Sequence, residues 1–264
     1  MKIDINLIKE LRNATFAPMG DCKSALEAAE GDLQKAIEIL REKGIAKAGK
    51  KADRETNEGM VKAETRNDKT VVLKMLCETD FVMKNERFQE LFSSIVDRLF
   101  TVDGNINSFE ELPSDLQAEL TETVAEFIGK IGENIKIAGV VITTEKVYGY
   151  NHMGNKVTSL VYYSGDENIA KEIALQVAAM NPTYLSLDEV PEDQKNELRA
   201  QFTEEMRKAG KPENMIANIV ESKIVKSFAE DVLLEQESIR DGSKKVKDLI
   251  TGDFSIKKFE RFSI

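Results

Sequence analysis

The sequence has little of the chemistry on which most enzymes depend. It holds one histidine and two cysteines among 264 residues, so sites built on several histidines are excluded. The cysteines, Cys22 and Cys77, lie far apart and form no C-x-x-C pair, which favours two reduced thiols over a disulfide framework or a zinc site. Any serine or cysteine nucleophile would depend on His152 as its base. We therefore expect no catalytic residue, no metal site and no cofactor.

Long apolar runs and an excess of positive charge are also missing. No stretch approaches the roughly 18 apolar residues that a membrane helix needs. Lys and Arg number 37 against 47 Asp and Glu, and the resulting net charge of -10 repels the phosphate backbone of nucleic acids. Residues 1–6 carry an early acid and no apolar signal segment. We therefore expect a cytoplasmic protein that binds neither nucleic acid nor a membrane.

Three runs of apolar residues at helical spacing occupy the first 44 residues. A loop over 15–20 separates the first two runs, Asp21 is the expected N-cap of the second, and Gly31-Asp32 separates the second from the third. Phe16 and Met19, placed in that loop, are candidates for contact with a partner. The next stretch, 46–58, alternates bases with acids, which is typical of a helix end that runs into a solvated linker. The pattern predicts a three-helix bundle with a boundary near residue 52.

Two similar units of strands and helices follow. Each has a hairpin, a helix and a later strand, and together they predict an α+β fold with two tandem subdomains, each an antiparallel sheet with helices, over 53–140 and 141–264. Two charged helices with narrow apolar stripes, within about 188–228, predict a protruding helical hairpin inserted in the second unit. Residues 253–264 predict a strand that completes the second sheet. The expected strands and turns are 60–66, 67–68, 70–77, 135–142, 146–150, 151–155 and 156–163.

Two catalytic or nucleotide-binding interpretations can be weighed on the residues alone. The segment 44–51 fits the phosphate-binding pattern G-x-x-x-x-G-K-[ST] except at Lys51, which cannot supply the magnesium-binding hydroxyl, and its context is a helix end rather than a strand. Cys77 with His152 could form a nucleophile and base, but a cysteine in an apolar strand is more often part of the core. A basic linker and a buried thiol are favoured instead.

Phe81 has two interpretations. It follows a strand and precedes a helix, near the apex of the expected loop, and composition alone favours a core plug because most phenylalanine side chains are buried. The alternative is an exposed anchor for a partner.

Several strings in one order carry a resemblance to a known family. Together they are similar to the translation elongation factor Ts family of bacterial type, over essentially the whole chain. These strings are 19–26 (MGDCKSAL), Gly31-Asp32 with Ala36-Ile37, 77–82 (CETDFV), 131–135 (IGENI), 152–154 (HMG) and 210–212 (GKP).

The resemblance implies a guanine nucleotide exchange factor that carries out no chemistry of its own. Such a factor binds elongation factor Tu in its GDP-bound and nucleotide-free states, releases GDP and allows GTP to bind. It also implies a bundle like a ubiquitin-associated domain that packs on the GTPase domain of the partner, and a second core half that contacts a β-barrel domain. Two competing hypotheses are an adaptor with a ubiquitin-binding bundle and a Cys-His enzyme.

The resemblance further implies the site residues. Thr79, Asp80, Phe81 and Val82 would enter beside the nucleotide site of the partner and dislocate its magnesium ion, with Phe81 as the wedge and Asp80 as the charged group. For Phe81, this implication favours the exposed anchor over the core plug that composition alone favours. Other implied contacts lie in the bundle and in the turn after the histidine: Leu11, Met19, Gly20, His152 and Gly154.

Overall fold

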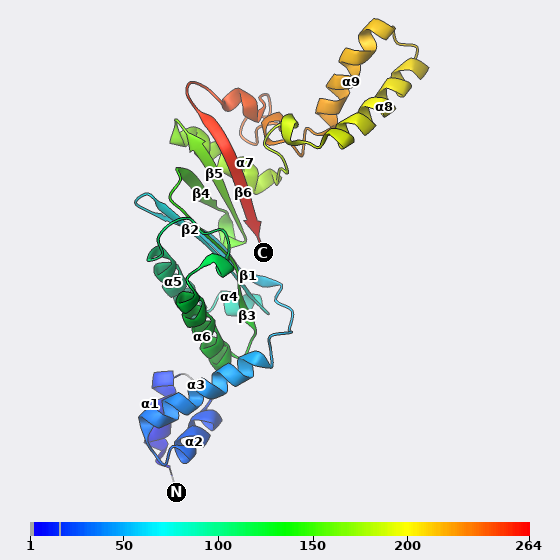
Figure 1. Ribbon diagram of the computed structural model, residues 1–264. Helices are drawn as coiled ribbons and strands as arrows, with labels where there is room; N and C mark the ends of the chain where they lie inside the picture. Colours follow the sequence, from blue (N-terminus) through cyan, green and yellow to red (C-terminus); the bar gives the residue numbers. More distant parts are fainter. Residues whose placement is uncertain (1–2, 16) are drawn as a thin grey trace. The chain divides into compact units, whose positions relative to one another are not determined.

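A computed structural model describes residues 3–15 and 17–264 (Figure 1). They form two compact units. The first unit comprises the chain up to Thr144 with residues 154–156 and 264, and the second comprises Glu145–Met153 and Val157–Ser263. Each unit contains a three-stranded antiparallel sheet with helices, so the predicted α+β class is confirmed. None of the helices in the described ranges is long and apolar enough to cross a membrane.

The N-terminal part of the first unit is the predicted bundle of three helices, α1 (Ile5–Thr15), α2 (Met19–Ala28) and α3 (Leu33–Gly49). Asp32 caps α3 by accepting a hydrogen bond from the Lys35 amide at 3.0 Å. The expected N-cap at Asp21 is wrong, because α2 begins at Met19 with Pro18 in the capping position. Asp21 lies in the first turn and pairs with Lys47 at 2.7 Å. Phe16 lies outside the described residues.

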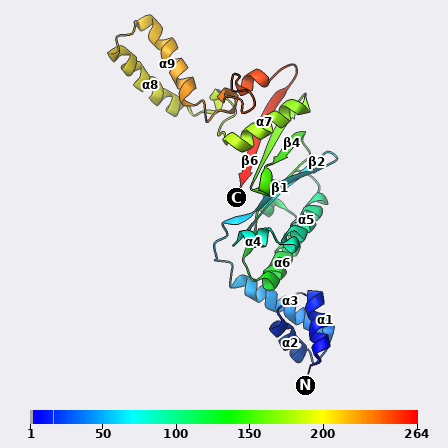
Figure 2. The same cartoon turned by 180° about the vertical axis from the view of Figure 1, so that it is seen from behind.

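The bundle packs on the rest of the first unit through α3 and α6 (Ser114–Ile131). Both views show α3 passing the C-terminal part of α6 (Figure 1, Figure 2). Although the sequence after residue 45 loses its apolar period, Ala48 near the end of α3 is 8% exposed and belongs to the core of this unit. Helix α3 therefore continues into the segment expected to start the linker. That the bundle folds independently, with a boundary near residue 52, stays a prediction.

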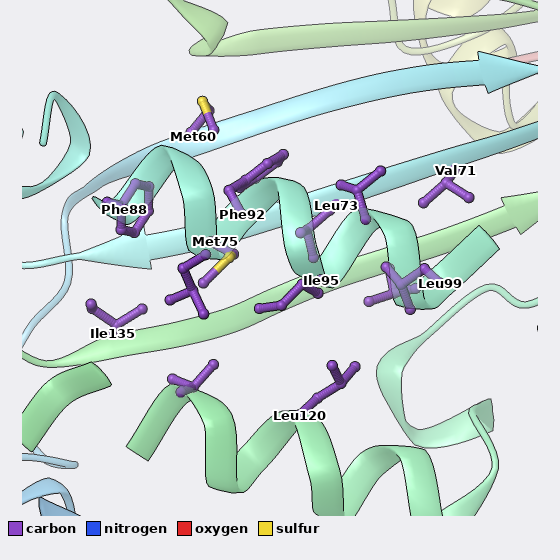
Figure 3. Close-up of a cluster of buried hydrophobic side chains, with 14 of the residues drawn as sticks. Met60, Val71, Leu73, Met75, Phe88, Phe92, Ile95, Leu99, Leu120 and Ile135 are labelled. Atoms are coloured by element: carbon purple, nitrogen blue, oxygen red, sulfur yellow. The ribbon is translucent and has the colours of Figure 1, made fainter. Parts of the chain in front are cut away.

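The first sheet has the order β1-β2-β3, and α5 and α6 supply the helical side of its core. The hairpin of β1 and β2 turns at Asn67, whose φ of 52° is the left-handed conformation that asparagine tolerates. Figure 3 shows Phe88 and Leu99 of α5 against Leu73 and Met75 of β2. The elements are β1 (Glu58–Arg66), β2 (Lys69–Cys77), α4 (Asp80–Met83), α5 (Glu86–Phe100), η1 (Phe109–Glu111) and β3 (Ile135–Thr143).

The second unit repeats this order of a hairpin, helices and a late third strand. Its sheet has the order β4-β5-β6, so the predicted closing strand does complete the second sheet. The predicted helical hairpin consists of α8 and α9, which pack together through Met206, Ile216 and Val220. The elements are β4 (Val147–Asn151), η2 (Met153–Asn155), β5 (Val157–Ser164), α7 (Glu167–Met180), η3 (Leu187–Glu189), α8 (Glu192–Lys208), α9 (Glu213–Ser227), η4 (Leu233–Glu235), η5 (Val246–Leu249) and β6 (Ser255–Ser263).

Candidate functional site

The segment after β2 presents a phenylalanine to solvent. Thr79 is the N-cap of the one-turn helix α4, and its Oγ1 accepts a hydrogen bond from the Val82 amide at 3.5 Å. Val82 is 5% exposed and packs in the core of the first unit, whereas Phe81 beside it is 80% exposed. Consecutive helical residues point in different directions, so anchoring Val82 inward turns Phe81 outward. The core-plug interpretation of Phe81 is wrong.

Phe81 is the most exposed of the large hydrophobic side chains in the part of the chain that the structure describes, followed by Ile5 at 60%. A single exposed apolar side chain is ordinary on a protein surface, but large aromatic groups are also the residues that most often anchor protein interfaces. Because 80% of Phe81 is exposed, it has little intramolecular packing to lose when it enters a partner. The turn is therefore suited to insertion.

Asp80, on the same turn, is held in its ionised form. Lys84 donates a hydrogen bond to its carboxylate at 2.7 Å, one helical turn further along the chain. This hydrogen bond lowers the pKa of Asp80 below its ordinary value. The side chain keeps 44% of its surface exposed. A fixed negative charge thus lies next to Phe81 and remains accessible to a cation or to another protein.

A pair of glutamates braces the turn against the segment between α6 and β3. Glu133 accepts hydrogen bonds from the Thr79 amide at 3.1 Å and from the Thr79 hydroxyl at 2.9 Å. In the opposite direction, Glu78 accepts a hydrogen bond from the Asn134 amide at 2.6 Å. The sequence contained both segments as separate strings but gave no sign that they meet.

The bundle residues implied as contacts have different environments. Met19 is 39% exposed, and Gly20 is exposed, with no atom outside its chain neighbours and its own helix backbone within 4 Å of the place where a Cβ would lie. Both begin α2, so they are available on the surface of the bundle. Leu11 is fully buried in the bundle core. In this structure Leu11 supports the bundle from inside and does not face outward.

The turn after β4 holds the other two implied contacts. The backbone amide of His152 donates to the Val157 carbonyl at 2.9 Å, while its side chain is exposed with the Tyr150 hydroxyl 3.3 Å from Nδ1. Gly154 has a φ of 81°, and space around it is open. A side chain at Gly154 would be strained by the backbone rather than by neighbours.

The two catalytic or nucleotide-binding interpretations find no support in the geometry. Burial raises the pKa of the Cys77 thiol to about 11, and this thiol donates to the Thr79 carbonyl at 3.2 Å. The stretch from Gly44 is helical through Gly49, so it does not form the strand-to-helix loop that cradles a phosphate. Among residues 3–15 and 17–264 there is no group of three or more metal-ligating side chains.

Fold and site together define an α+β protein with a braced turn that offers an aromatic side chain for contact. The chain belongs to the elongation factor Ts family: the family model described as elongation factor TS matches residues 78–264. Elongation factor Ts of Hydrogenobaculum sp. (strain Y04AAS1) is 40% identical over 100% of this chain and 99% of its own length. Elongation factor Ts of Aquifex aeolicus (strain VF5) is 38% identical over 100% of this chain and 98% of its own length. Family membership supports a nucleotide-exchange role in translation elongation and implies elongation factor Tu as the partner.

Proposed function

We propose that the chain releases GDP from elongation factor Tu by inserting the turn 79–82 beside the nucleotide site and dislocating the magnesium ion there. The observation that carries the proposal is the 80% exposure of Phe81 on a turn whose neighbour, Val82, is anchored in the core. Phe81 acts as a wedge. Asp80 supplies a negative charge that reorganises the surroundings of the ion. The chain carries out no chemical step itself, and it uses neither nucleic acid nor a membrane.

Nucleotide exchange follows from a difference in the factor's affinity for two states of its partner, the nucleotide-free state and the GDP-bound state. A GTPase holds GDP through contacts to the phosphates and through Mg²⁺, so a factor that binds the nucleotide-free state more tightly than the GDP-bound state lowers the affinity for GDP. Linkage requires the reverse effect too: GDP lowers the affinity for the factor by the same ratio. The ternary complex is therefore weak and short-lived, and GTP can bind once GDP has left.

The wedge alone is too weak for this task. Burying one phenylalanine contributes about 1.5–3 kcal/mol, or roughly one to two decades in an equilibrium constant. The remaining free energy comes from a broad interface. We assign it to the bundle around Met19 and Gly20, docked on the GTPase domain with Leu11 as internal support, and to the second core half around His152 and Gly154, docked on a β-barrel domain.

Release of labelled GDP from purified elongation factor Tu tests the proposal. With excess unlabelled GDP present, substoichiometric amounts of the full chain should release all of the labelled GDP, because the incoming nucleotide displaces the factor and lets it act again. Asp80→Ala should slow release in the presence of Mg²⁺, and most of this defect should disappear when Mg²⁺ is chelated. Asp97→Ala is the matched control, since Asp97 is an exposed carboxylate of α5 that pairs with Arg66 of β1 at 2.6 Å.

Two results would contradict the proposal. A full chain that fails to accelerate GDP release would exclude the exchange function. An Asp80→Ala defect of equal size with and without Mg²⁺ would exclude the proposed action of Asp80 through the ion.

A further inference from the structure

We infer that Glu133 is a positioning residue for exchange, which holds Phe81 in its outward orientation through Thr79. This inference rests on the proposed function of the turn 79–82. Glu133 lies between α6 and β3, far along the chain from the turn that it contacts.

The contact between Glu133 and Thr79 uses both groups that Thr79 can offer as donors. One carboxylate oxygen, Oε2, accepts from the Thr79 amide at 3.1 Å, and the other, Oε1, accepts from the Thr79 hydroxyl at 2.9 Å. The same hydroxyl oxygen accepts from the Val82 amide at 3.5 Å. A chain of hydrogen bonds therefore runs from Glu133 through Thr79 to Val82, across the turn that carries Phe81.

A second, reciprocal contact joins the same two segments, and we call the two contacts, Glu133 with Thr79 and Glu78 with Asn134, the brace. Glu78 accepts from the Asn134 amide at 2.6 Å, so each glutamate binds the backbone of the residue that follows the other glutamate. Asn134 is 2% exposed, and its side-chain amide donates to the carbonyls of Ala52 at 3.3 Å and Arg54 at 2.9 Å. The same group of contacts thus fixes the segment that leaves α3.

Two positive charges offset the repulsion between the two carboxylates. Arg54 pairs with Glu78 at 3.3 Å, and Lys51 donates a hydrogen bond to the carbonyl of Gly132, directly before Glu133. Hydrogen bonds that involve an ionised partner are about twice as strong as neutral ones. The brace is therefore a charged, fully bonded arrangement rather than a chance meeting of surface loops.

Such a brace is needed because α4 has only four residues. A single helical turn is unstable by itself. Without a restraint, the Phe81 side chain would also sample orientations in which it packs against the surface of its own protein. Fixing the outward orientation before binding removes an ordering cost from the step in which Phe81 enters the partner. Loss of the brace should reduce the rate of GDP release at saturating factor more than it reduces the affinity of the complex.

The test uses Glu133→Ala and Glu133→Gln in the full chain. We expect Glu133→Ala to slow GDP release at saturating factor about tenfold, with less than about threefold change in the concentration for half-maximal release. Glu133→Gln keeps an oxygen acceptor for the Thr79 amide and should stay within about threefold of the native rate. Glu119→Ala is the matched control, because Glu119 is an exposed carboxylate of α6 that pairs with Arg98.

A double-mutant cycle with Phe81→Ala separates positioning from a structural effect. If Glu133 acts through Phe81, Glu133→Ala should cause no further slowing in a Phe81→Ala background. In the free protein, hydrogen exchange at the Thr79 amide should accelerate about tenfold or more in Glu133→Ala, and the control should leave it unchanged.

Failure of this inference about Glu133 can be told apart from failure of the proposed role of Phe81. If Phe81→Ala alone releases GDP at the native rate, the wedge is wrong, and the exchange rate of the Thr79 amide still reports whether the brace exists. Equal slowing by Glu133→Ala in the native and Phe81→Ala backgrounds would overturn the inference. GDP release at the native rate by Glu133→Ala would also overturn it, as would an unchanged rate of hydrogen exchange at the Thr79 amide in that variant.

Discussion

Gly44 of α3 and Gly129 of α6 cross with their backbones in contact. A Cβ added at Gly129 would lie 2.4 Å from the Cα of Gly44, a distance that real Cβ atoms do not reach. A Cβ added at Gly44 would lie 3.6 Å from the Cα of Gly129, which is ordinary contact. Gly129 is therefore the residue that sets how closely the two helices approach. Arg41 strengthens the same contact by pairing with Glu126 at 2.7 Å.

Gly129→Ala should separate α3 from α6. The methyl group meets backbone that cannot rotate away, so we expect a loss of about 1–3 kcal/mol in the free energy of unfolding. Gly49→Ala is the control, because a Cβ at Gly49 near the end of α3 meets nothing within 4 Å. Denaturant unfolding of both variants measures the difference. Equal stability of the two variants would show that the helices can shift apart without cost.

Glu235 makes stability depend on pH. Burial alone would raise its pKa, but hydrogen bonds from Lys245 and Lys247 outweigh burial and lower the pKa below the ordinary 4.5. A carboxyl whose folded pKa is depressed stabilises the fold above its unfolded pKa, and this stabilisation disappears as the pH falls through the folded pKa. Glu235→Gln should therefore cost about 1–3 kcal/mol at pH 7.

The cost of Glu235→Gln should shrink as the pH falls below 4.5, the ordinary pKa of a glutamate. Denaturant unfolding of both proteins across the acid range measures it. Glu213→Gln serves as the control, since Glu213 pairs with Arg207 on the exposed surface of the helical hairpin and should contribute little at any pH. A cost for Glu235→Gln that stays constant with pH would contradict the assignment.

The two thiols should be unreactive in the folded protein. Cys22 and Cys77 are both fully buried, and burial raises the pKa of each. Because the thiolate is the reactive species, a disulfide reagent at pH 8 should label neither residue until denaturant is added, when both should react. Absorbance of the released thiolate measures the labelling. Rapid labelling of Cys77 in native buffer would restore the Cys-His hypothesis, and Cys77→Ser with native GDP release would remove it.

Local patterns in the sequence were sufficient for most of the fold. Strand patterns over 60–66 and 70–77 with a turn at 67–68 predicted the first hairpin, which turns at Asn67. The start of α2 was misplaced because Asp21 matches N-cap preference, whereas Pro18, with φ of -55°, already suits a helix start. Both signals are local, and only the surrounding packing decides between them.

The parts that sequence could not supply depend on contacts between distant segments. Nothing in the residues near Glu133 indicates that it binds Thr79, because no local rule pairs one loop with another. Ala48 is buried by α6 despite its charged neighbours. Composition favoured burial of Phe81, and only the resemblance to a family favoured its exposure; the deciding physical fact is the inward anchoring of Val82.

Phe81→Ala tests the central claim most directly, with denaturant unfolding and labelled-GDP release measured on the same preparation. Because Phe81 is 80% exposed, we predict an unfolding free energy within about 1 kcal/mol of the native chain and GDP release slowed about tenfold or more. Met180→Ala, which truncates an exposed side chain of α7, should change neither. A Phe81→Ala chain that is folded, equally stable and releases GDP at the native rate would contradict the account.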